Sequence, residues 1–399
     1  MRKLIGAFCI LVSVFIITYV LYVNSQYKGT TREFSGYTLL NSSWQLYAKK
    51  FINNDGRVID YSQNNITTSE GQSYALLRAV WIDDKPTFDR VWKWTKENMK
   101  RPHDNLFGWR WGQRSDKTYG FMPDGGDNSA TDADEDITLA LIFASYRWGD
   151  TSYLDSAKKI LPDLWKIDTA DAYGKRYVIA GNWAQNDREL VINPSYFAPY
   201  AWKIFAQVDT KDNWNSLVDP AYTLLTDAGD VPLDKEKNVG LPPDWLVIDR
   251  HTGAFKPPVN MGSFTTNYSF DAMRIPWRVA LDASWNNDTQ AKAYLNKVCT
   301  PLEQHYQNDH KLVNTYLHDG TKGNDEESAA MYATALGCFI STNPTTAQDI
   351  YQNKIVKLYA NDTNTFRSNI TYYDQNWLWF GAAMYNKFLI PFKPTKHNG

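Results

Sequence analysis

The 399-residue sequence predicts one all-helical domain behind an N-terminal apolar segment. Segments of helical length with a single apolar face recur along the chain, and clusters of Gly, Pro, Asn and Asp separate them. Strand-like alternation of apolar and polar residues is sparse. No repeat of fixed period and no low-complexity break divides the chain, so we expect a single domain over residues 35–399. A ring of helical hairpins is the natural way to close so many helices around one core.

The N-terminal segment predicts a membrane anchor. Arg2 and Lys3 precede an uncharged, almost wholly apolar stretch at residues 4–23, long enough at helical rise to cross a hydrocarbon core. A cleaved signal peptide usually has a shorter apolar region and an Ala-x-Ala-like site, and none follows this stretch. We therefore expect residues 1–26 to be an uncleaved signal anchor, with secretion after signal cleavage as the alternative. The basic N-terminus places the rest of the chain outside the membrane, at the cell surface.

Residues 27–34 form a polar linker, and the predicted helices follow it. The clearest pattern has apolar residues three and four positions apart on one helix face, at Ile137, Ala140, Leu141, Ala144 and Trp148. Similar patterns predict helices at residues 72–81, 87–99, 153–165, 199–205, 278–285, 327–339, 346–358 and 377–388.

Two long irregular stretches interrupt these helices, at residues 103–130 and 241–269. Both are rich in Gly, Pro, Asn and aromatic residues. Loops of this length in a compact domain are usually functional, so we expect both to border a binding site.

Charge and composition favour a neutral, sugar-like ligand. The net charge is only −2 and no long basic or acidic run occurs, which excludes the usual electrostatic footprint of a nucleic-acid partner. Aromatic residues make up 15% of the chain, including 16 Trp and 25 Tyr. Tyr and Trp combine a flat apolar face with a polar tip, as a sugar-binding cleft requires, although most of them belong to the core. We expect a monomer with a polysaccharide substrate.

The cysteines leave one pairing possible in the helical domain. Cys9 lies in the apolar segment, so only Cys299 and Cys338 remain. An extracellular domain permits a disulfide between them. Two buried thiols are an equal alternative, because the residues around Cys338 have a core-like sequence.

A first candidate catalytic residue is Glu70, in a polar cluster at residues 67–74 directly ahead of an apolar helical pattern. Taken alone, this cluster is typical of helix capping. Thr68 or Ser69 would cap the helix, and Glu70 would complement the dipole in its first turn.

A second cluster, at residues 128–136, also precedes a helix. It holds four acids in five residues, at Asp132, Asp134, Glu135 and Asp136. An EF-hand loop needs Gly at its sixth position and Glu at its twelfth, where this segment has Ile137 and Phe143. Histidines are few and scattered. We therefore expect no metal and no cofactor.

A third cluster contains Asp271 at another predicted helix start. Arg274 follows three residues later and so lies on the same helix face. By itself this pair is typical of a local ion pair, which contributes little when exposed.

The three clusters would meet in a ring of helical hairpins. The inner helices of such a ring run parallel, so their N-terminal ends gather on one face. Glycoside hydrolysis needs two carboxyl groups there, one acid for the leaving oxygen and one base for water. The negative charge of Asp132 would raise the pKa of a nearby Glu70, whereas helix dipoles would lower it. The sequence leaves the net direction open.

At these residues the chain resembles glycoside hydrolase family 8, the family of bacterial endoglucanases. Its signature is an Ala, Ser/Thr, Asp, Ala/Gly, Asp start to a helix that ends in Trp. The positions that fit are Ala130, Thr131, Asp132, Ala133, Asp134, Ile137, Ala140, Leu141, Ile142, Ala144 and Trp148. Thr138 departs from it, where the family usually has Ala. Residues 69–71 resemble the general-acid motif, residues 271–274 the motif of the catalytic base, and residues 193–196 and 372–374 family segments near the cleft.

The resemblance implies an (α/α)6 barrel and an inverting mechanism, with Glu70 as the acid and Asp271 as the base. The two carboxyl groups of such a pair lie about 6.5 to 9.5 Å apart. It further implies substrate contacts from Asp132, Arg274, Tyr196 and Tyr373. As aromatic sugar platforms we expect Trp109 and Trp111 first, and Trp183 and Trp245 second.

The resemblance implies that the substrate is a β-linked polysaccharide, and we expect β-1,4 linkage and endo attack. Members of the family act on cellulose, mixed-linkage glucan, xylan, chitosan or bacterial exopolysaccharide, and no residue decides among them. The anchor favours an exopolysaccharide at the surface of the producing cell. The alternative function is a non-catalytic glycan-binding component of polysaccharide synthesis or export.

Overall fold

The computed structural model describes residues 36–360, 365–367 and 370–394. The predicted anchor at residues 1–26 and linker at residues 27–34 lie outside these ranges. Within them, no helix combines the length and apolar character needed to cross a membrane.

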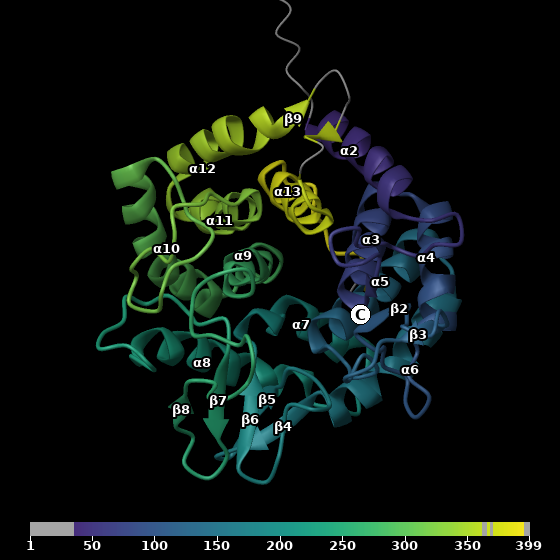
Figure 1. The fold of residues 1–399 in the computed structure, drawn as a ribbon, viewed down its shortest axis with the longest axis horizontal. Coiled ribbons are helices and arrows are strands. Elements are labelled where there is room, and N and C mark those ends of the chain that lie inside the picture. The colour runs from purple at the N-terminus through teal and green to yellow at the C-terminus, as the bar shows by residue number, and fades with distance from the viewer. Residues whose placement is uncertain (1–35, 361–364, 368–369, 395–399) are drawn as a thin grey trace, which may run out of the picture.

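Twelve α-helices of the described residues pair into six hairpins that form a ring (Figure 1). The inner helices are α3 (Ser69–Ile82), α5 (Thr131–Trp148), α7 (Pro199–Val208), α9 (Ile275–Asn286), α11 (Ala329–Thr342) and α13 (Tyr372–Tyr385). The outer helices are α4 (Lys85–Asn98), α6 (Thr151–Ile167), α8 (Val218–Asp230), α10 (Thr289–Asp309), α12 (Pro344–Ile350) and α2 (Gly36–Phe51). Each inner helix packs against the outer helix that follows it. The last inner helix, α13, packs against α2, which closes the ring.

The inner and outer helices differ in how much of their surface is buried. In α3 every residue from Gly71 to Ile82 is buried, so this helix touches protein on all sides. In α6 the buried residues are spaced three or four apart on one face, at Tyr153, Ala157, Ile160, Leu161 and Leu164. The inner ring is therefore the core, and the outer ring shields it from water.

Aromatic side chains and glycines set the spacing between the inner helices. Trp277 of α9 contacts Trp377 and Phe380 of α13 with ring centroids 5.4 and 5.3 Å apart. A Cβ atom on Gly337 of α11 would lie 2.5 Å from the Pro276 carbonyl oxygen, and one on Gly381 of α13 would lie 2.5 Å from the Ala333 carbonyl oxygen. Glycine is required at both positions because neighbouring helix backbones touch there.

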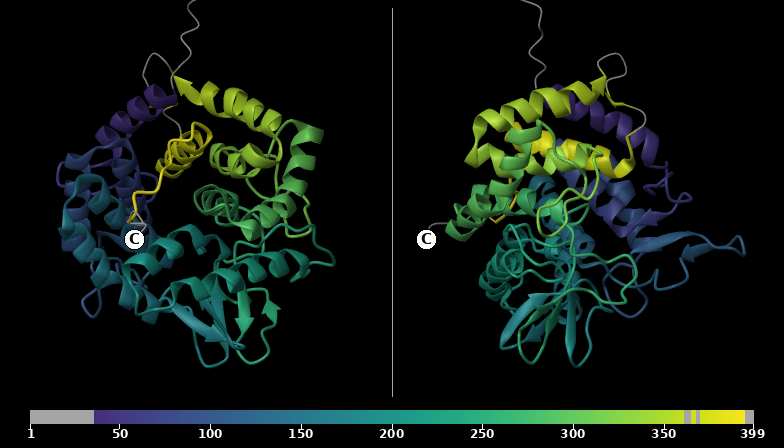
Figure 2. Two further views of the ribbon diagram at one scale, coloured as in Figure 1. Left: turned by 180° about the vertical axis from the view of Figure 1, so that it is seen from behind. Right: turned by 60° about the vertical axis from the view of Figure 1, so that its left-hand side comes forward.

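The inner helices begin on the same face of the ring, and polar side chains cap three of them. Thr68 accepts a hydrogen bond from the backbone of Gly71, Ser328 caps α11, and Thr371 caps α13 in the same way. Figure 2 shows long loops projecting from one face while the C-terminal segment lies at the opposite face. The two faces thus differ in character: one carries helix N-termini and loops, and the other carries helix C-termini.

Short strands lie in the connections, so the all-helical prediction describes the core and not the loops. The strands form antiparallel sheets of two or three members. Their bounds are β1 (Thr67–Thr68), β2 (Arg110–Gln113), β3 (Tyr119–Phe121), β4 (Thr169–Ala172), β5 (Lys175–Val178), β6 (Glu189–Ile192), β7 (Leu246–Asp249), β8 (Phe255–Lys256), β9 (Tyr359–Ala360) and β10 (Thr365–Phe366). Strands of two to four residues are too short to show a period of two.

Short helical turns complete the description: η1 (Pro194–Tyr196), η2 (Trp214–Leu217), η3 (Ala272–Arg274), η4 (Tyr351–Ile355) and η5 (Val356–Leu358). The helix predicted at residues 346–358 is built from α12, η4 and η5 in succession. The prediction omitted α2, α8 and α10 altogether.

Cys299 and Cys338 form a disulfide that links outer helix α10 to inner helix α11, with their Cα atoms 5.4 Å apart. Both residues are buried. The structure therefore contains the disulfide and not the two buried thiols that the sequence left as the alternative.

Candidate active site

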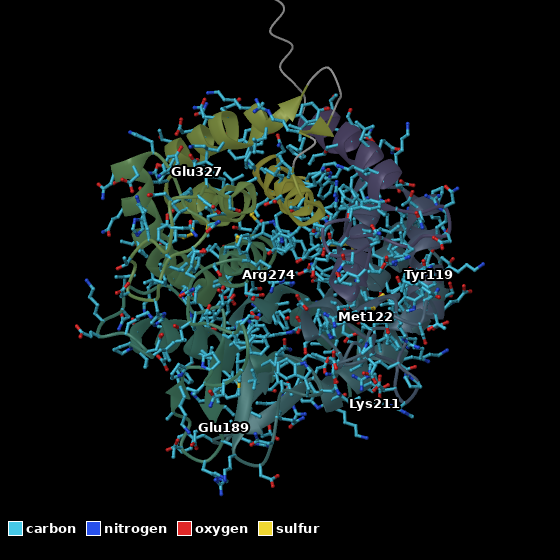
Figure 3. The ribbon with its side chains drawn as sticks, in the orientation of Figure 1. Tyr119, Met122, Glu189, Lys211, Arg274 and Glu327 are labelled. Atoms are coloured by element: carbon cyan, nitrogen blue, oxygen red, sulfur yellow. A yellow bond between two sulfur atoms is a disulfide. The ribbon has the colours of Figure 1, made fainter. Side chains whose placement is uncertain are left out.

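A cavity of about 510 Å³ opens at the face where the inner helices begin. Its lining comes from loops and helix starts that are far apart in the sequence: Asp60, Ser62, Gln63, Thr68, Ser69, Glu70, Trp109, Ala130, Asp132, Tyr196, Phe270, Thr371, Tyr372, Tyr373 and Asp374. Figure 3 places Arg274 near the centre of the ring.

Arg274 joins the three carboxylates singled out in the sequence. Its Nη1 atom donates to Glu70 Oε2 at 3.1 Å and to Asp132 Oδ2 at 3.0 Å. Its Nη2 atom donates to Asp271 Oδ1 at 2.5 Å. The Arg274 side chain is only 2% exposed, so these charge-assisted bonds are formed almost without water.

Two further contacts fix the guanidinium. Arg274 Nη2 also donates to Ser195 Oγ at 2.8 Å, and the guanidinium carbon lies 5.4 Å from the centre of the Tyr196 ring. Both partners belong to the η1 segment directly before α7. Four inner-helix starts therefore contribute to this one cluster.

The position of each carboxylate follows from a helix start. Glu70 lies in the first turn of α3, behind the Thr68 cap, and Asp132 lies in the first turn of α5. Asp271 directly precedes the η3 turn that leads into α9, and Arg274 ends that turn. The positive ends of the helix dipoles favour negative charge at such positions.

Glu70 has the properties of an acid that is protonated near neutrality. Burial raises the pKa of Glu70 to about 7, and the charges of Asp132 and Asp271 add to this effect, while Arg274 and a hydrogen bond from Tyr372 oppose it. The Tyr372 hydroxyl donates to Glu70 Oε1 at 3.1 Å. Although 24% of the side chain is accessible from the cavity, protein surrounds the rest of it. Desolvation therefore outweighs the ion pair and sets the net direction that the sequence left open.

Asp132 and Asp271 occupy different environments. The Asp132 side chain is 4% exposed, and burial raises its pKa against the opposing charges of Arg274 and Arg278. The Asp271 side chain is 31% exposed, so it is the most accessible of the three carboxylates. Its Oδ2 atom accepts a hydrogen bond from Trp245 Nε1 at 3.0 Å.

The other three acids of the second cluster serve the fold. Asp136 forms a buried double hydrogen bond with Arg278, at 2.8 and 3.0 Å. Glu135 accepts from Trp202 Nε1 at 2.6 Å, and Asp134 accepts from the backbone of Phe107 at 2.9 Å. Of these four acids, only Asp132 lines the cavity.

Three of the predicted aromatic contacts, Tyr196, Tyr373 and Trp109, line the cavity. The Tyr373 hydroxyl donates to the Phe270 carbonyl oxygen at 2.6 Å, which ties α13 to the loop that carries Asp271. Trp109 Nε1 donates to the Gly125 carbonyl oxygen at 2.9 Å. These bonds fix the ring orientations, as a sugar-stacking wall requires.

Trp111 is placed differently. Its ring stacks on Tyr119 at 5.4 Å, meets Trp94 edge-on at 5.0 Å and lies 4.7 Å from the Arg57 guanidinium. It is absent from the lining of the cavity.

The two secondary platform candidates belong to one aromatic cluster with Phe264. Trp245 stacks face to face on Phe264 at 3.9 Å, and Trp183 lies 5.7 Å from the same ring. Trp183 is 39% exposed and open to a ligand, whereas Trp245 is buried and donates to Asp271.

Sequence reasoning missed several residues of the site. Asp60, Ser62 and Gln63 line the cavity from a turn in which Asp60 accepts hydrogen bonds from both of the others. The polar run at residues 60–65 is a signal for such a turn, but nothing in it indicates the cavity. Asp244 accepts hydrogen bonds from the backbone N–H groups of Asp271 and Ala272. In the sequence it only follows two prolines, which does not indicate this role.

Comparisons with known proteins agree with this geometry. The family model described as glycosyl hydrolases family 8 matches residues 28–381. The chain is 32% identical over 305 residues to endoglucanase A of Acetivibrio thermocellus, which covers 73% of this chain and 58% of the relative. It is also 32% identical over 237 residues to an endoglucanase of Cellulomonas uda, covering 59% of this chain and 62% of the relative. The chain thus spans about three-fifths of the length of these relatives.

Solved structures share the fold. An endo-1,4-D-glucanase from Vibrio fischeri aligns with a TM-score of 0.72 at 24% identity, over 86% of this chain and 94% of that one. A β-1,3-1,4-glucanase from Paenibacillus sp. X4 aligns with a TM-score of 0.73 at 20% identity, over 88% and 92%. A cold-adapted family 8 xylanase aligns with a TM-score of 0.70 at 18% identity, over 93% and 95%.

Proposed function

This chain belongs to glycosyl hydrolase family 8, and from that premise we propose that it hydrolyses internal bonds of a β-1,4-linked glucan with inversion at the anomeric carbon. One observation carries the proposal. Glu70, Asp132 and Asp271 surround a single buried arginine at an open cavity, each through its own hydrogen bond. Such a cavity has the size of a small-ligand site and takes a short stretch of glycan chain.

The reaction needs an acid and a base on opposite sides of the scissile bond. Glu70, protonated below a pKa of about 7, gives its proton to the glycosidic oxygen as the bond from that oxygen to the anomeric carbon breaks. Asp271 takes a proton from a water molecule whose oxygen attacks the same carbon from the other face. The products are two shorter chains, and the new reducing end has inverted configuration.

Arg274 keeps the acid and the base apart. Glu70 and Asp271 bind different terminal nitrogens of the guanidinium, so its width separates their carboxyl groups. An inverting pair must leave room for a water molecule between its carboxyl groups. The guanidinium also offsets part of the repulsion among the three carboxylates.

Asp132 and the aromatic walls supply the substrate contacts. Asp132 lies deeper than the other two carboxylates, so it is placed to accept a hydrogen bond from a sugar hydroxyl rather than to exchange protons with water. Tyr196, Tyr373 and Trp109 present rings to the cavity. Rings of this kind stack on the apolar faces of sugars, and their polar tips bind the hydroxyl groups.

The preference for a β-1,4 glucan rests on relatives whose names are endoglucanase. The same fold also occurs in a β-1,3-1,4-glucanase and in a xylanase, so these polymers are the next candidates. Within this class we favour an exopolysaccharide of the producing cell, on the strength of the apolar segment at residues 4–23.

The proposed location is the outer surface of the membrane, with residues 1–26 as the anchor. The described chain begins at Gly36, which touches the side chain of Asn386 just beyond the C-terminal end of α13. Tyr37 lies 5.9 Å from Phe388 in the same region. This is the face opposite the cavity, so an anchor there would leave the cavity open to polymer. The disulfide fits an oxidising compartment.

A product assay tests the proposal. The domain from about residue 29 onward is incubated with β-1,4 glucan, mixed-linkage glucan, xylan, chitosan and the host exopolysaccharide, beside its Glu70→Gln variant. Glu97→Gln is the matched control, because Glu97 is exposed on outer helix α4 and does not line the cavity. Shortened oligosaccharides from the wild type and the control, but not from Glu70→Gln, would support the proposal. Binding without products on every polymer would favour a non-catalytic glycan-binding role.

A further inference from the structure

Two consecutive residues, Asp244 and Trp245, hold the segment that carries Asp271. Trp245 Nε1 donates to Asp271 Oδ2 at 3.0 Å. Asp244 Oδ1 accepts from the backbone N–H groups of Ser269, Asp271 and Ala272 at 3.0, 3.2 and 2.7 Å. The first residue therefore fixes the backbone of Asp271, and the second fixes its carboxyl group.

This dipeptide is itself rigidly held. The backbone N–H groups of Asp244 and Trp245 donate to the carbonyl oxygens of Asn267 and Thr265, at 2.6 and 3.0 Å. The indole lies nearly parallel to the Phe264 ring, with an angle of 7° between the planes. Strand β7 begins at the next residue and is paired on both edges, with β6 and β8. The support for Asp271 is thus anchored in a sheet outside the helical ring.

The two oxygens of Asp271 have separate partners. Arg274 binds Oδ1 and Trp245 binds Oδ2, so the carboxyl group cannot rotate without breaking one bond. A carboxylate has about four lone-pair sites, and these contacts use two of them. The remaining sites can accept a proton from water in a fixed direction.

We propose that Asp244 and Trp245 are positioning residues for the general base Asp271, acting on its backbone and on its carboxyl oxygen respectively. The inference rests on the proposed function for the role of Asp271. It adds that efficient turnover requires two residues that do not line the cavity and need not touch the substrate.

Charged and titratable groups from several elements surround Asp271. They are Arg274 on its own turn, Glu70 of α3, Asp132 of α5, Tyr196 of η1, Tyr373 of α13, and Asp244 in the segment before β7. Against this fixed background, the Trp245 N–H group stabilises the negative charge of the carboxylate through its hydrogen bond. Loss of that N–H group should slow the step in which Asp271 accepts a proton from water.

The first test is Trp245→Phe, which removes the N–H donor and keeps a ring on Phe264. We expect kcat/KM to fall about 10-fold to 100-fold below neutral pH, the range for one lost hydrogen bond to a charged group. The loss should fall on kcat, with KM nearly unchanged, because Trp245 does not line the cavity. Trp148→Phe is the control, because Trp148 Nε1 donates to the carboxylate of Asp83 away from the cavity, and its kcat should stay within about twofold of the wild type.

A second readout does not depend on catalysis. The carboxyl ¹³C resonance of Asp271, identified by its loss in Asp271→Asn, is compared at one pH in the wild type, in Trp245→Phe and in Trp148→Phe. A changed chemical shift in Trp245→Phe alone supports the proposal even if no tested glycan is cleaved. Absence of cleavage would instead refute the proposed function. An unchanged resonance and an unchanged kcat, with a rise in KM alone, would overturn the role of Trp245.

Asp244 is tested by a pair of variants. Asp244→Asn keeps an oxygen that can accept the three backbone N–H groups, whereas Asp244→Ala does not. We expect kcat of the Asn variant to stay within a fewfold of the wild type, and kcat of the Ala variant to fall at least about tenfold with KM nearly unchanged. Equal kcat in the two variants, at equal folded fraction by circular dichroism, would contradict the positioning role.

Discussion

At the scale of single residues, Arg274 decides how the cavity works. One buried cation faces three carboxylates, so the cluster carries an excess of negative charge when all three are ionised. Protonation of one carboxyl group is the least costly way to reduce this repulsion. Burial and the two neighbouring charges direct that proton to Glu70, whose pKa is about 7. A proton is thus kept on Glu70, the residue that we propose as the general acid.

The pH profile should report this proton. Glu70 must be protonated to act, so we expect kcat/KM of the wild type to decline as the pH rises through about 7. Asp132→Asn removes a negative neighbour of Glu70, which should lower the pKa of Glu70 and move the alkaline limb to lower pH. Initial rates on a soluble oligosaccharide between pH 4 and pH 9 provide the measurement. An alkaline limb that is the same in both proteins would contradict this assignment.

Stability should depend on the same residue. The pKa of Glu70 is raised from 4.5 to about 7 on folding, so its favourable contribution is complete below about pH 4.5 and is lost as the pH rises through about 7. Glu70→Gln stays neutral, and we expect it to be more stable than the wild type by about 3 kcal/mol at pH 8 and equal to it near pH 4. Urea unfolding at the two pH values tests this. A variant less stable than the wild type at pH 8 would contradict it.

The sequence placed Glu70, Asp132, Asp271 and Arg274 together, because each stands at a predicted helix start and inner helices share a direction. It could not give the net pKa of Glu70, since desolvation depends on the neighbours that tertiary structure supplies. Trp245 was expected only as a sugar platform, because an indole that donates to a carboxylate has the same sequence signal as one that stacks on sugar.

At the scale of elements, the acids of α5 show how one helix serves both the site and the core. Asp132 faces the cavity, while Asp136, one turn later, pairs with Arg278 of α9 deep inside the ring. Buried pairs cost much when only one partner is removed. Arg278→Met should therefore reduce the free energy of unfolding by roughly 3–5 kcal/mol.

The control for Arg278→Met is Lys85→Met on the surface. Lys85 and Asp89 have side chains 39% and 45% exposed, so their ion pair should contribute less than about 1 kcal/mol. Urea denaturation of the two variants gives the comparison. Equal losses of stability would show that the buried pair has no special role.

The disulfide between α10 and α11 should stabilise the fold without affecting the cavity. Cys299 and Cys338 are 39 residues apart in sequence, and cross-linking a loop of that length is expected to contribute about 2–4 kcal/mol. Cys299→Ser with Cys338→Ser should lower the unfolding free energy by that amount and leave kcat/KM of the folded protein within twofold. Loss of activity in the still-folded double variant would contradict this.

Among the elements, the sequence pattern revealed helices with a clear apolar stripe and missed others for local reasons. Pro220 and Gly229 lie within α8, and Pro301 lies within α10, so both helices contain residues that usually end one. In α2, by contrast, Leu40, Trp44 and Tyr47 form an apolar stripe of helical spacing, although the sequence prediction contains no helix there. The β strands were missed because they are only two to four residues long, too short to show a period of two.

At the scale of the whole molecule, the cavity and the first described residue lie on opposite faces of the ring. The N-terminal ends of the inner helices and the long loops build the cavity, while the first described residue, Gly36, lies beside the C-terminal end of α13. A tether on that second face does not compete with polymer for space at the first. Catalysis and attachment should therefore be separable.

Removal of residues 1–28 should test this separation. We expect the truncated protein to be released from the membrane fraction and to keep kcat/KM on soluble oligosaccharides within about twofold, because the anchor takes no part in transition-state binding. The full-length chain should stay with the membrane after a salt wash. Its appearance in the soluble fraction with a shortened N-terminus would instead show that the segment is a cleaved signal.

The most direct test of the central claim is the configuration of the first product. Proton NMR during early hydrolysis of a β-1,4 gluco-oligosaccharide distinguishes the two anomers at the new reducing end before they interconvert. With Glu70 as the acid and Asp271 as the base for water, the α-anomer should appear first. First appearance of the β-anomer would mean a retaining reaction through a covalent intermediate, and would contradict the roles assigned to both residues.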